Sequence, residues 1–224
     1  MKFVRDAILS GLWAWVTLGT EKFQGPSKRR IIMTNILVML VSVLCVPHVI
    51  FFAIYDAQGL IVPIIIISLV AIAFQLTPIL NALWPYAGGL YNLILWLGFA
   101  TTNAWMFSAQ SAIHFYLLAG ATTAIAIFGV RQNLLSIISI GLGLTAFIYA
   151  DRNFAEPADF LNLTNTFLTI LYFISIPTTL LAIFCMVFYG FKQASTAEEA
   201  LQREYEYSEA LLANMLPGGP SPRN

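Results

Sequence analysis

Long apolar stretches dominate the chain, and short polar or turn-forming segments separate them. A helix that crosses about 30 Å of hydrocarbon needs roughly 20 mostly apolar residues. Division of the chain at the polar interruptions predicts six membrane-spanning helices and no strands. The fold class is therefore an all-α, polytopic six-helix transmembrane bundle. The predicted spans cover about residues 31–54, 60–80, 90–107, 112–130, 133–150 and 163–191.

The interruptions carry residues that favour turns. Asp56 and Gly59 follow the first span, and Pro85 with Gly88 and Gly89 precedes the third. The segment Ser108–Ser111 is predicted to be a turn, because the apolar region around it is too long for one crossing.

The positions of the basic residues predict the orientation of the bundle. Lys and Arg are retained on the cytoplasmic side of a membrane. With six spans and a cytoplasmic N-terminus, the outer loops hold only Arg152. We therefore expect a multi-pass protein of the plasma (inner) membrane with both termini in the cytoplasm. The inner segments hold Lys2, Arg5, Lys22, Lys28, Arg29, Arg30, Arg131, Lys192, Arg203 and Arg223.

Composition excludes several classes of protein. Hydrophobic residues make up 59% of the chain and charged residues 10%, with a formal net charge of zero. Soluble domains carry about a quarter charged residues, so a soluble enzyme is excluded. Without a basic patch or net positive charge we expect no nucleic-acid partner. The lipid bilayer is the expected partner instead.

Residues 1–30 are expected to form a cytoplasmic N-terminal interfacial helix. Val4, Ile8, Leu12 and Trp15 recur at helical spacing, and the polar residues between them can face water or headgroups. A flexible leader is the alternative.

The predicted spans of domain 31–192 contain no Asp, Glu, Lys or Arg. Proton-coupled transporters and charged pores need such groups at membrane depth. Two histidines, His48 and His114, lie in the outer half of the predicted bundle, with Asn103 and Trp105 near them. They form a candidate outer-half pocket for a small or lipidic ligand, and interhelical hydrogen bonding is the alternative. Two histidines without a third ligand predict no metal site.

Residues 193–217 differ in composition from the predicted spans. Glutamates become frequent, and Ser195 with Glu198 has the spacing of a capping box. This pattern predicts a cytoplasmic helix that pairs as a coiled coil, and we expect a parallel homodimer. A single amphipathic helix on the membrane is the alternative. Apolar and small residues repeat at intervals of about 4 and 3, as in a coiled-coil seam, at Leu201, Tyr205, Ser208, Leu212 and Met215.

The segment Ser208–Pro217 reads S-E-A-L-L-A-N-M-L-P. It resembles the segment that joins the six-helix membrane anchor to the catalytic domain in bacterial membrane-bound class III adenylate cyclases. The resemblance implies that residues 193–217 act as a transducer helix. It also implies a parent protein that is an adenylate cyclase, a phosphorus-oxygen lyase. In that family two aspartates of the catalytic domain bind Mg or Mn with ATP, which is converted to cyclic AMP and pyrophosphate.

The sequence departs from this family after Pro217. Residues 218–224 read G-G-P-S-P-R-N and are expected to be a disordered tail or the end of a truncation. The catalytic domain is absent, so we assign no catalytic residue and no cofactor and expect this chain alone to be inactive. The leading hypothesis is a membrane anchor and sensor that dimerises and transmits its state to a cyclase domain. The sensor of a diguanylate cyclase or histidine kinase, and a small transporter or channel, are the alternatives.

Overall fold

The structure is a computed structural model that describes residues 10–128 and 132–215, which are almost all helical and contain no strand. The all-α prediction is confirmed for these residues. The helices are α2 (Gly25–Asp56), α3 (Ile61–Phe74), α4 (Thr77–Leu83), α5 (Ala87–Phe107), α6 (Tyr116–Phe128), α7 (Asn133–Asn153) and α8 (Asn165–Met215), with the short 3₁₀ turns η1 (Ala109–Ser111) and η2 (Ile113–Phe115) between α5 and α6.

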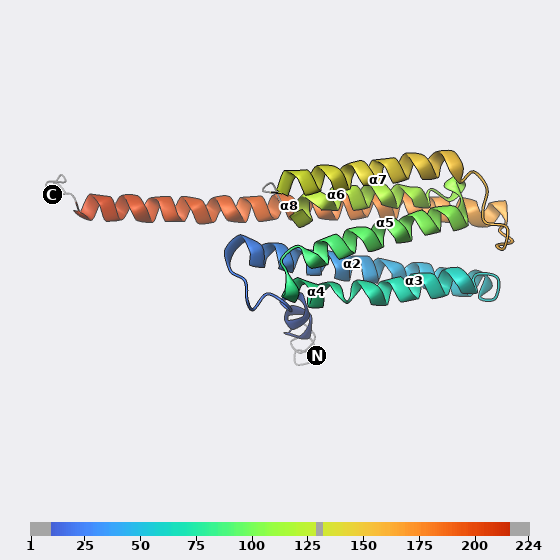
Figure 1. Cartoon of the computed structure of the whole chain (residues 1–224), viewed down its shortest axis with the longest axis horizontal. Coiled ribbons are helices and arrows are strands. Elements are labelled where there is room, and N and C mark those ends of the chain that lie inside the picture. The colour runs from blue at the N-terminus through green and yellow to red at the C-terminus, as the bar shows by residue number, and fades with distance from the viewer. Residues whose placement is uncertain (1–9, 129–131, 216–224) are drawn as a thin grey trace. The chain divides into compact units, whose positions relative to one another are not determined.

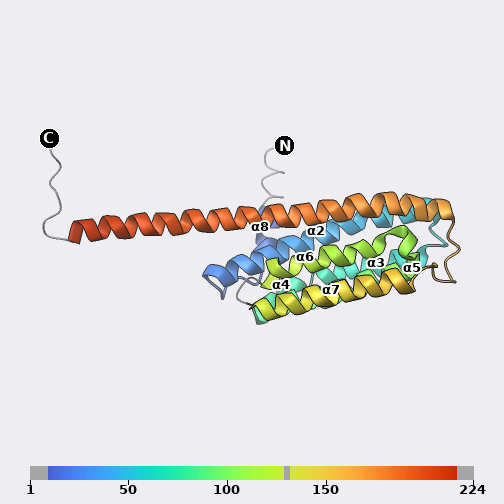
Figure 2. The ribbon, with the colours of Figure 1, turned by 90° about the horizontal axis from the view of Figure 1, so that it is seen from above.

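The chain divides into two compact units, Met1–Ile183 and Phe184–Asn224. In the first unit α2, α3, α5, α6 and α7 run side by side (Figures 1 and 2). Neighbours in sequence pack together, with α3 on α2, α5 on α4 and α7 on α6. This arrangement is a helical bundle with short connections.

Turn chemistry explains where the helices of the first unit end. After α2, the amide of Gly59 donates a hydrogen bond to Asp56 Oδ1 (3.0 Å). The predicted second span is divided into α3 and α4, because Pro78 has no amide hydrogen for the preceding turn. The predicted turn Ser108–Ser111 is confirmed, since η1 occupies it.

Several large apolar side chains are exposed, and several amide side chains are buried. Ile54 is 81% exposed and Ile94 is 71% exposed, whereas Asn35, Asn81 and Asn92 are buried. Lipid is as apolar as these exposed side chains, so a membrane bundle places its polar groups between helices. The surface of the first unit therefore suits a bilayer.

Four described helical stretches are long and apolar enough to cross a membrane: Ser27–Asp56, Ile61–Leu83, Asn133–Asn153 and Asn165–Leu212. The prediction of six crossings goes beyond this finding. The 21 residues of α5 include several polar side chains, and α6 has 13 residues. A multi-pass membrane domain is supported, and the number six stays a prediction.

The N-terminal region is described from residue 10, so Val4 and Ile8 of the predicted interfacial helix lie outside the described residues. Residues 10–16 are helical. Leu12 is exposed, Trp15 is half-buried, and Val16 is buried. Asn35 of α2 fixes the end of this helix, because its Nδ2 donates to the carbonyls of Val16 (2.9 Å) and Leu18 (3.0 Å).

The second unit contains the end of α8. The prediction of a capped helix start at Ser195 is wrong, because α8 is one helix from Asn165 to Met215 and Ser195 lies inside it. Every side chain from Leu201 to Leu212 is exposed. The side chain of Met215 and residues 216–224, including Pro217, lie outside the described part of the chain.

Candidate functional site

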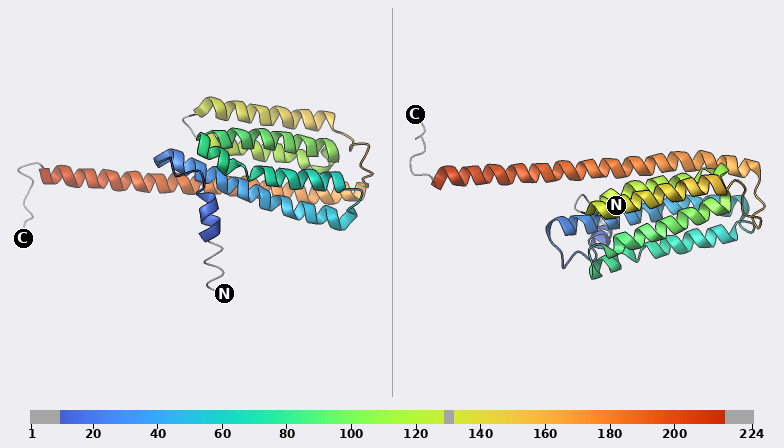
Figure 3. Two further views of the ribbon diagram at one scale, coloured as in Figure 1. Left: turned by 60° about the horizontal axis from the view of Figure 1, so that its bottom comes forward. Right: turned by 45° about the horizontal axis from the view of Figure 1, so that its top comes forward.

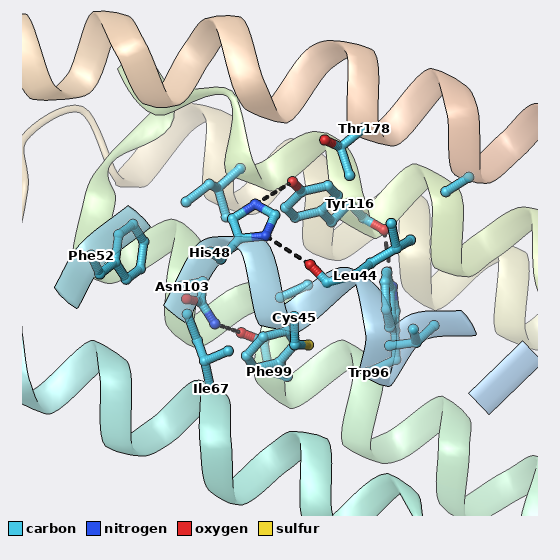
Figure 4. A pocket seen from close by; sticks show the side chains of 14 residues that line it. Leu44, Cys45, His48, Phe52, Ile67, Trp96, Phe99, Asn103, Tyr116 and Thr178 are labelled. Carbon is cyan, nitrogen blue, oxygen red and sulfur yellow. Dashed lines mark hydrogen bonds between the residues drawn. The ribbon is translucent and has the colours of Figure 1, made fainter. Parts of the chain in front are cut away.

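A small cavity lies inside the first unit, between α2, α3, α5, α6 and the part of α8 before residue 184 (Figure 4). Its volume is about 50 Å³, which is room for a few water molecules. Its walls are mostly apolar, and the few polar side chains in them come from different helices. The labelled polar groups are His48, Asn103, Tyr116 and Thr178.

His48 of α2 forms the best-defined polar contact in the cavity wall. Its Nδ1 lies 2.9 Å from the carbonyl oxygen of Leu44, and its Nε2 lies 3.0 Å from the hydroxyl of Tyr116. A carbonyl oxygen only accepts, so Nδ1 carries the proton and donates it. In the neutral imidazole Nε2 then accepts a hydrogen bond from Tyr116. This pair joins α2 to the first residue of α6.

Asn103 is buried in α5 and lies on another side of the same cavity. Its Nδ2 donates to the carbonyl of Phe99, one turn earlier (2.8 Å). The amide is therefore held by its own helix. It offers a second polar group to the cavity without bonding His48.

Trp96 closes the cavity on the α6 side. Its Nε1 donates to the carbonyl oxygen of Tyr116 (2.9 Å). The indole lies against Gly120, where a Cβ atom would collide with the ring. This contact could not be predicted from the sequence, because the spacing of a glycine does not reveal which ring packs on it.

The other two predicted pocket residues lie elsewhere. Trp105 is 47% exposed and its ring packs near Phe160 (5.8 Å between centroids). His114 of η2 is buried against Phe147 of α7, and its Nε2 lies 3.6 Å from Asp151 Oδ1. The structure thus brings His48 and Asn103 to one cavity and leaves Trp105 and His114 outside its lining.

Tyr116 and Thr178 line the cavity although the sequence analysis did not name them. Tyr116 lies two residues after His114, so the predicted fourth span already contained it. Thr178 follows Pro177, and a proline inside a predicted span was the sequence feature that could have pointed to this position.

Within residues 10–128 and 132–215, no group of three or more His, Cys, Asp or Glu side chains gathers into a possible metal site. The polar groups of the cavity are neutral amide, imidazole, indole, hydroxyl and thiol groups. This arrangement can hydrogen-bond a small uncharged molecule or hold the helices together. Both ring nitrogens of His48 are already bonded, so His48 does not serve as a base for the Cys45 thiol.

Comparison with curated proteins finds no match. A family model described as MASE7 matches residues 20–205. The match begins before α2 and extends through α7 into the exposed part of α8, so it covers well over half of the chain. The chain therefore belongs to the MASE7 family, a type of membrane-associated sensory domain.

Proposed function

We propose that this chain is the membrane sensor of a class III adenylate cyclase, and that it works as a parallel dimer. Its family supports a membrane sensory role. The segment Ser208–Pro217 supports the choice of output domain, since it resembles the connection to that catalytic domain. The chain itself regulates, and the parent's catalytic domain converts ATP to cyclic AMP.

The observation that carries the proposal is the extent of α8. Thr178 and Ala182 line the cavity, and Leu201 and Leu212 belong to the predicted seam, yet all four residues belong to one helix without a break. A change in the cavity wall therefore acts on the same element that pairs the two chains. No loop interrupts the connection between them.

The part of α8 beside the cavity is suited to bending. Pro177 lacks the amide hydrogen that would bond one turn back. The hydroxyls of Thr178 and Thr179 donate to the carbonyls of Ile174 (2.7 Å) and Ser175 (2.8 Å). Such back-bonding by threonine weakens and bends helices. Two arrangements of α8 that differ in bend or rotation would differ in the shape of the cavity.

Signalling then requires a ligand whose affinity differs between the two arrangements of α8. A small molecule that binds one arrangement of the cavity better shifts the population toward it. The proposed ligand is a small molecule, because the cavity has a volume of only about 50 Å³ and its walls are mostly apolar. His48 and Asn103 supply the polar contacts.

We propose six crossings with both termini in the cytoplasm. The α5 helix, at 21 residues, measures about 31 Å, which matches the hydrocarbon thickness. The distribution of basic residues supports this orientation. Under this topology α8 leaves the membrane on the side where a cyclase would find ATP.

The dimer is proposed to form along the seam Leu201, Tyr205, Ser208, Leu212 and Met215. Leu201, Tyr205 and Leu212 are each more than half exposed in the single chain. Pairing would bury these apolar side chains, and each fully buried Leu contributes about 2 kcal/mol. Two heptads form a weak coiled coil, so the membrane helices must also contribute to the dimer.

Fusion of residues 1–217 to a class III cyclase catalytic domain tests the proposal. Ala182→Phe fills the cavity from α8, and Leu181→Phe places the same ring on the exposed neighbouring position. We expect Ala182→Phe to change cyclic AMP production in membranes about fivefold or more, a common size of coupling between sites. Leu181→Phe should leave the production unchanged. Equal activity of both variants and the unsubstituted fusion would overturn the proposal.

A further inference from the structure

Although the composition as a whole predicts no basic patch, a local cluster of basic residues surrounds the beginning of α2. Lys28 and Arg29 are exposed, and Arg30 is half-buried. Lys22 precedes the helix, and Glu21 is the one carboxylate between residues 20 and 30. The ion pairs found among the described residues join His114 to Asp151 and Arg203 to Glu199, so none neutralises this cluster.

Arg30 is held in a fixed orientation. Its guanidinium carbon lies 4.3 Å from the centre of the Tyr86 ring, which is a cation–π contact. The hydroxyl of Tyr86 accepts a hydrogen bond from Gln132 Nε2 (3.3 Å), so the ring is itself held in place. The flat face of the guanidinium is thereby occupied, while its N–H groups point out from the edge.

One of these edge atoms lacks an acceptor. Nη1 of Arg30 is buried and has no hydrogen-bond partner among the described residues. A buried donor on a charged group is costly when it stays unpaired. An oriented guanidinium with an unpaired N–H is the arrangement that binds phosphate or carboxylate oxygens.

The surroundings of Arg30 match the headgroup level of a bilayer. Trp13 is 63% exposed and Trp84 is 49% exposed, and tryptophan favours the membrane interface. The helical residues 10–16 lie close to α2 in Figure 3, and Gly19 closely approaches the backbone of Pro78 in α4. The first turn of α2 contains no acidic residue and no side-chain cap.

We propose that Arg30, with Lys28 and Arg29, binds the phosphate of an anionic phospholipid. The cluster carries a net positive charge, and a lipid such as phosphatidylglycerol carries a net negative one. Phosphatidylcholine has the same phosphate, but its choline cation opposes the basic side chains. The cluster therefore selects for anionic lipid, and the exposed tryptophans place it at the depth of the phosphate. This inference is independent of the proposed output domain.

Lipid binding to the purified full chain in detergent tests the proposal. Native mass spectrometry with added phosphatidylglycerol or phosphatidylcholine gives the affinity for each. We expect tighter binding of phosphatidylglycerol, and Arg30→Gln should weaken it about tenfold, as expected for loss of hydrogen bonds to a charged group. Arg30→Lys should retain only part of the affinity, because an ammonium group lacks the planar fork.

Control variants, the two lipids and competition by phosphate test whether the cluster binds anionic lipid. Arg152→Gln removes an exposed arginine at the other end of the bundle and should leave the affinity unchanged. The pair Lys28→Gln and Arg29→Gln changes only exposed side chains, so it tests the cluster if Arg30→Gln fails to fold. Equal binding of the two lipids, or unchanged affinity in both the Arg30 and the Lys28/Arg29 variants, overturns the proposal. Competition by inorganic phosphate at the lipid's own concentration range would also overturn it, since the site would then be one for free anions.

Discussion

The two parts of α8 differ in what surrounds their side chains. In the first unit Phe167 and Leu171 are fully buried, and their neighbours come from other helices of the bundle. In the second unit Leu201 and Leu212 are more than half exposed. The same helix thus contains a segment whose apolar side chains are buried in the bundle and a segment whose apolar side chains are left exposed.

The two segments should therefore respond differently to substitution. Changes in the bundle should alter folding, because the contacts already exist in a single chain. Changes in the seam should alter association and leave folding intact.

The largest loss of stability is expected at Gly120. A leucine there would collide with the Trp96 indole, and overpacking of this kind costs about 3 kcal/mol. Unfolding by denaturing detergent in mixed micelles measures the free energy. Gly141→Leu is the control, because a Cβ atom at Gly141 meets no atom within 4 Å. Similar stabilities of the two variants would contradict the packing.

Asn35→Ala should cost about 2 kcal/mol. Its amide donates to two backbone carbonyls of the N-terminal segment, and its Oδ1 accepts from Asn81 Nδ2 (2.9 Å). The same unfolding measurement applies, and Asn162→Ala, at an exposed loop position, should be neutral. A neutral Asn35→Ala would mean that the N-terminal helix is not anchored through this side chain.

Leu212→Glu should weaken dimerisation about tenfold or more without changing the stability of the monomer. Introduction of a charge into a coiled-coil seam opposes pairing. Sedimentation or single-molecule photobleaching in nanodiscs measures the association. Tyr207→Glu makes the same kind of change at an exposed position outside the seam and should have no effect. If both variants dimerise like the unsubstituted chain, the seam is wrongly assigned.

The smallest effect is expected at the cavity. Tyr116→Phe removes the hydrogen bond to His48 Nε2 and should cost about 1 kcal/mol. The double variant with His48→Phe should cost less than the sum of the single variants, because both polar partners are then removed. Additive costs in this cycle would show that the two side chains do not interact.

Much of the bundle could be predicted from apolar runs and turn residues. The ends of α2 and α7 fall within a few residues of the predicted spans, since Asp56 and Asn153 lie where polarity rises. The continuity of α8 was missed because Ser195 and Glu198 imitate a helix start. A capping pattern marks the start of a helix only where the preceding residues are not helical. Residues 191–194 contain no glycine or proline, so the helix continues through them.

The candidate pocket was predicted less well, for a physical reason. Depth in the membrane follows from position along a span, which placed His48, Asn103 and His114 in the same half. Rotation about the helix axis decides which neighbour a side chain meets, and uniformly apolar helices carry little information about rotation. In the structure His48 therefore contacts Tyr116, whereas His114 lies against Phe147 and Asp151.

In the proposed mechanism, α8 passes the state of the cavity to the seam. Electron paramagnetic resonance between spin labels on two paired chains measures it directly, with Glu206→Cys as the labelled site and Cys45 and Cys185 replaced by alanine. In nanodiscs, Ala182→Phe should shift the distribution of distances between the labels, while Leu181→Phe leaves it unchanged. Identical distributions for the two variants and the labelled parent would contradict the claim.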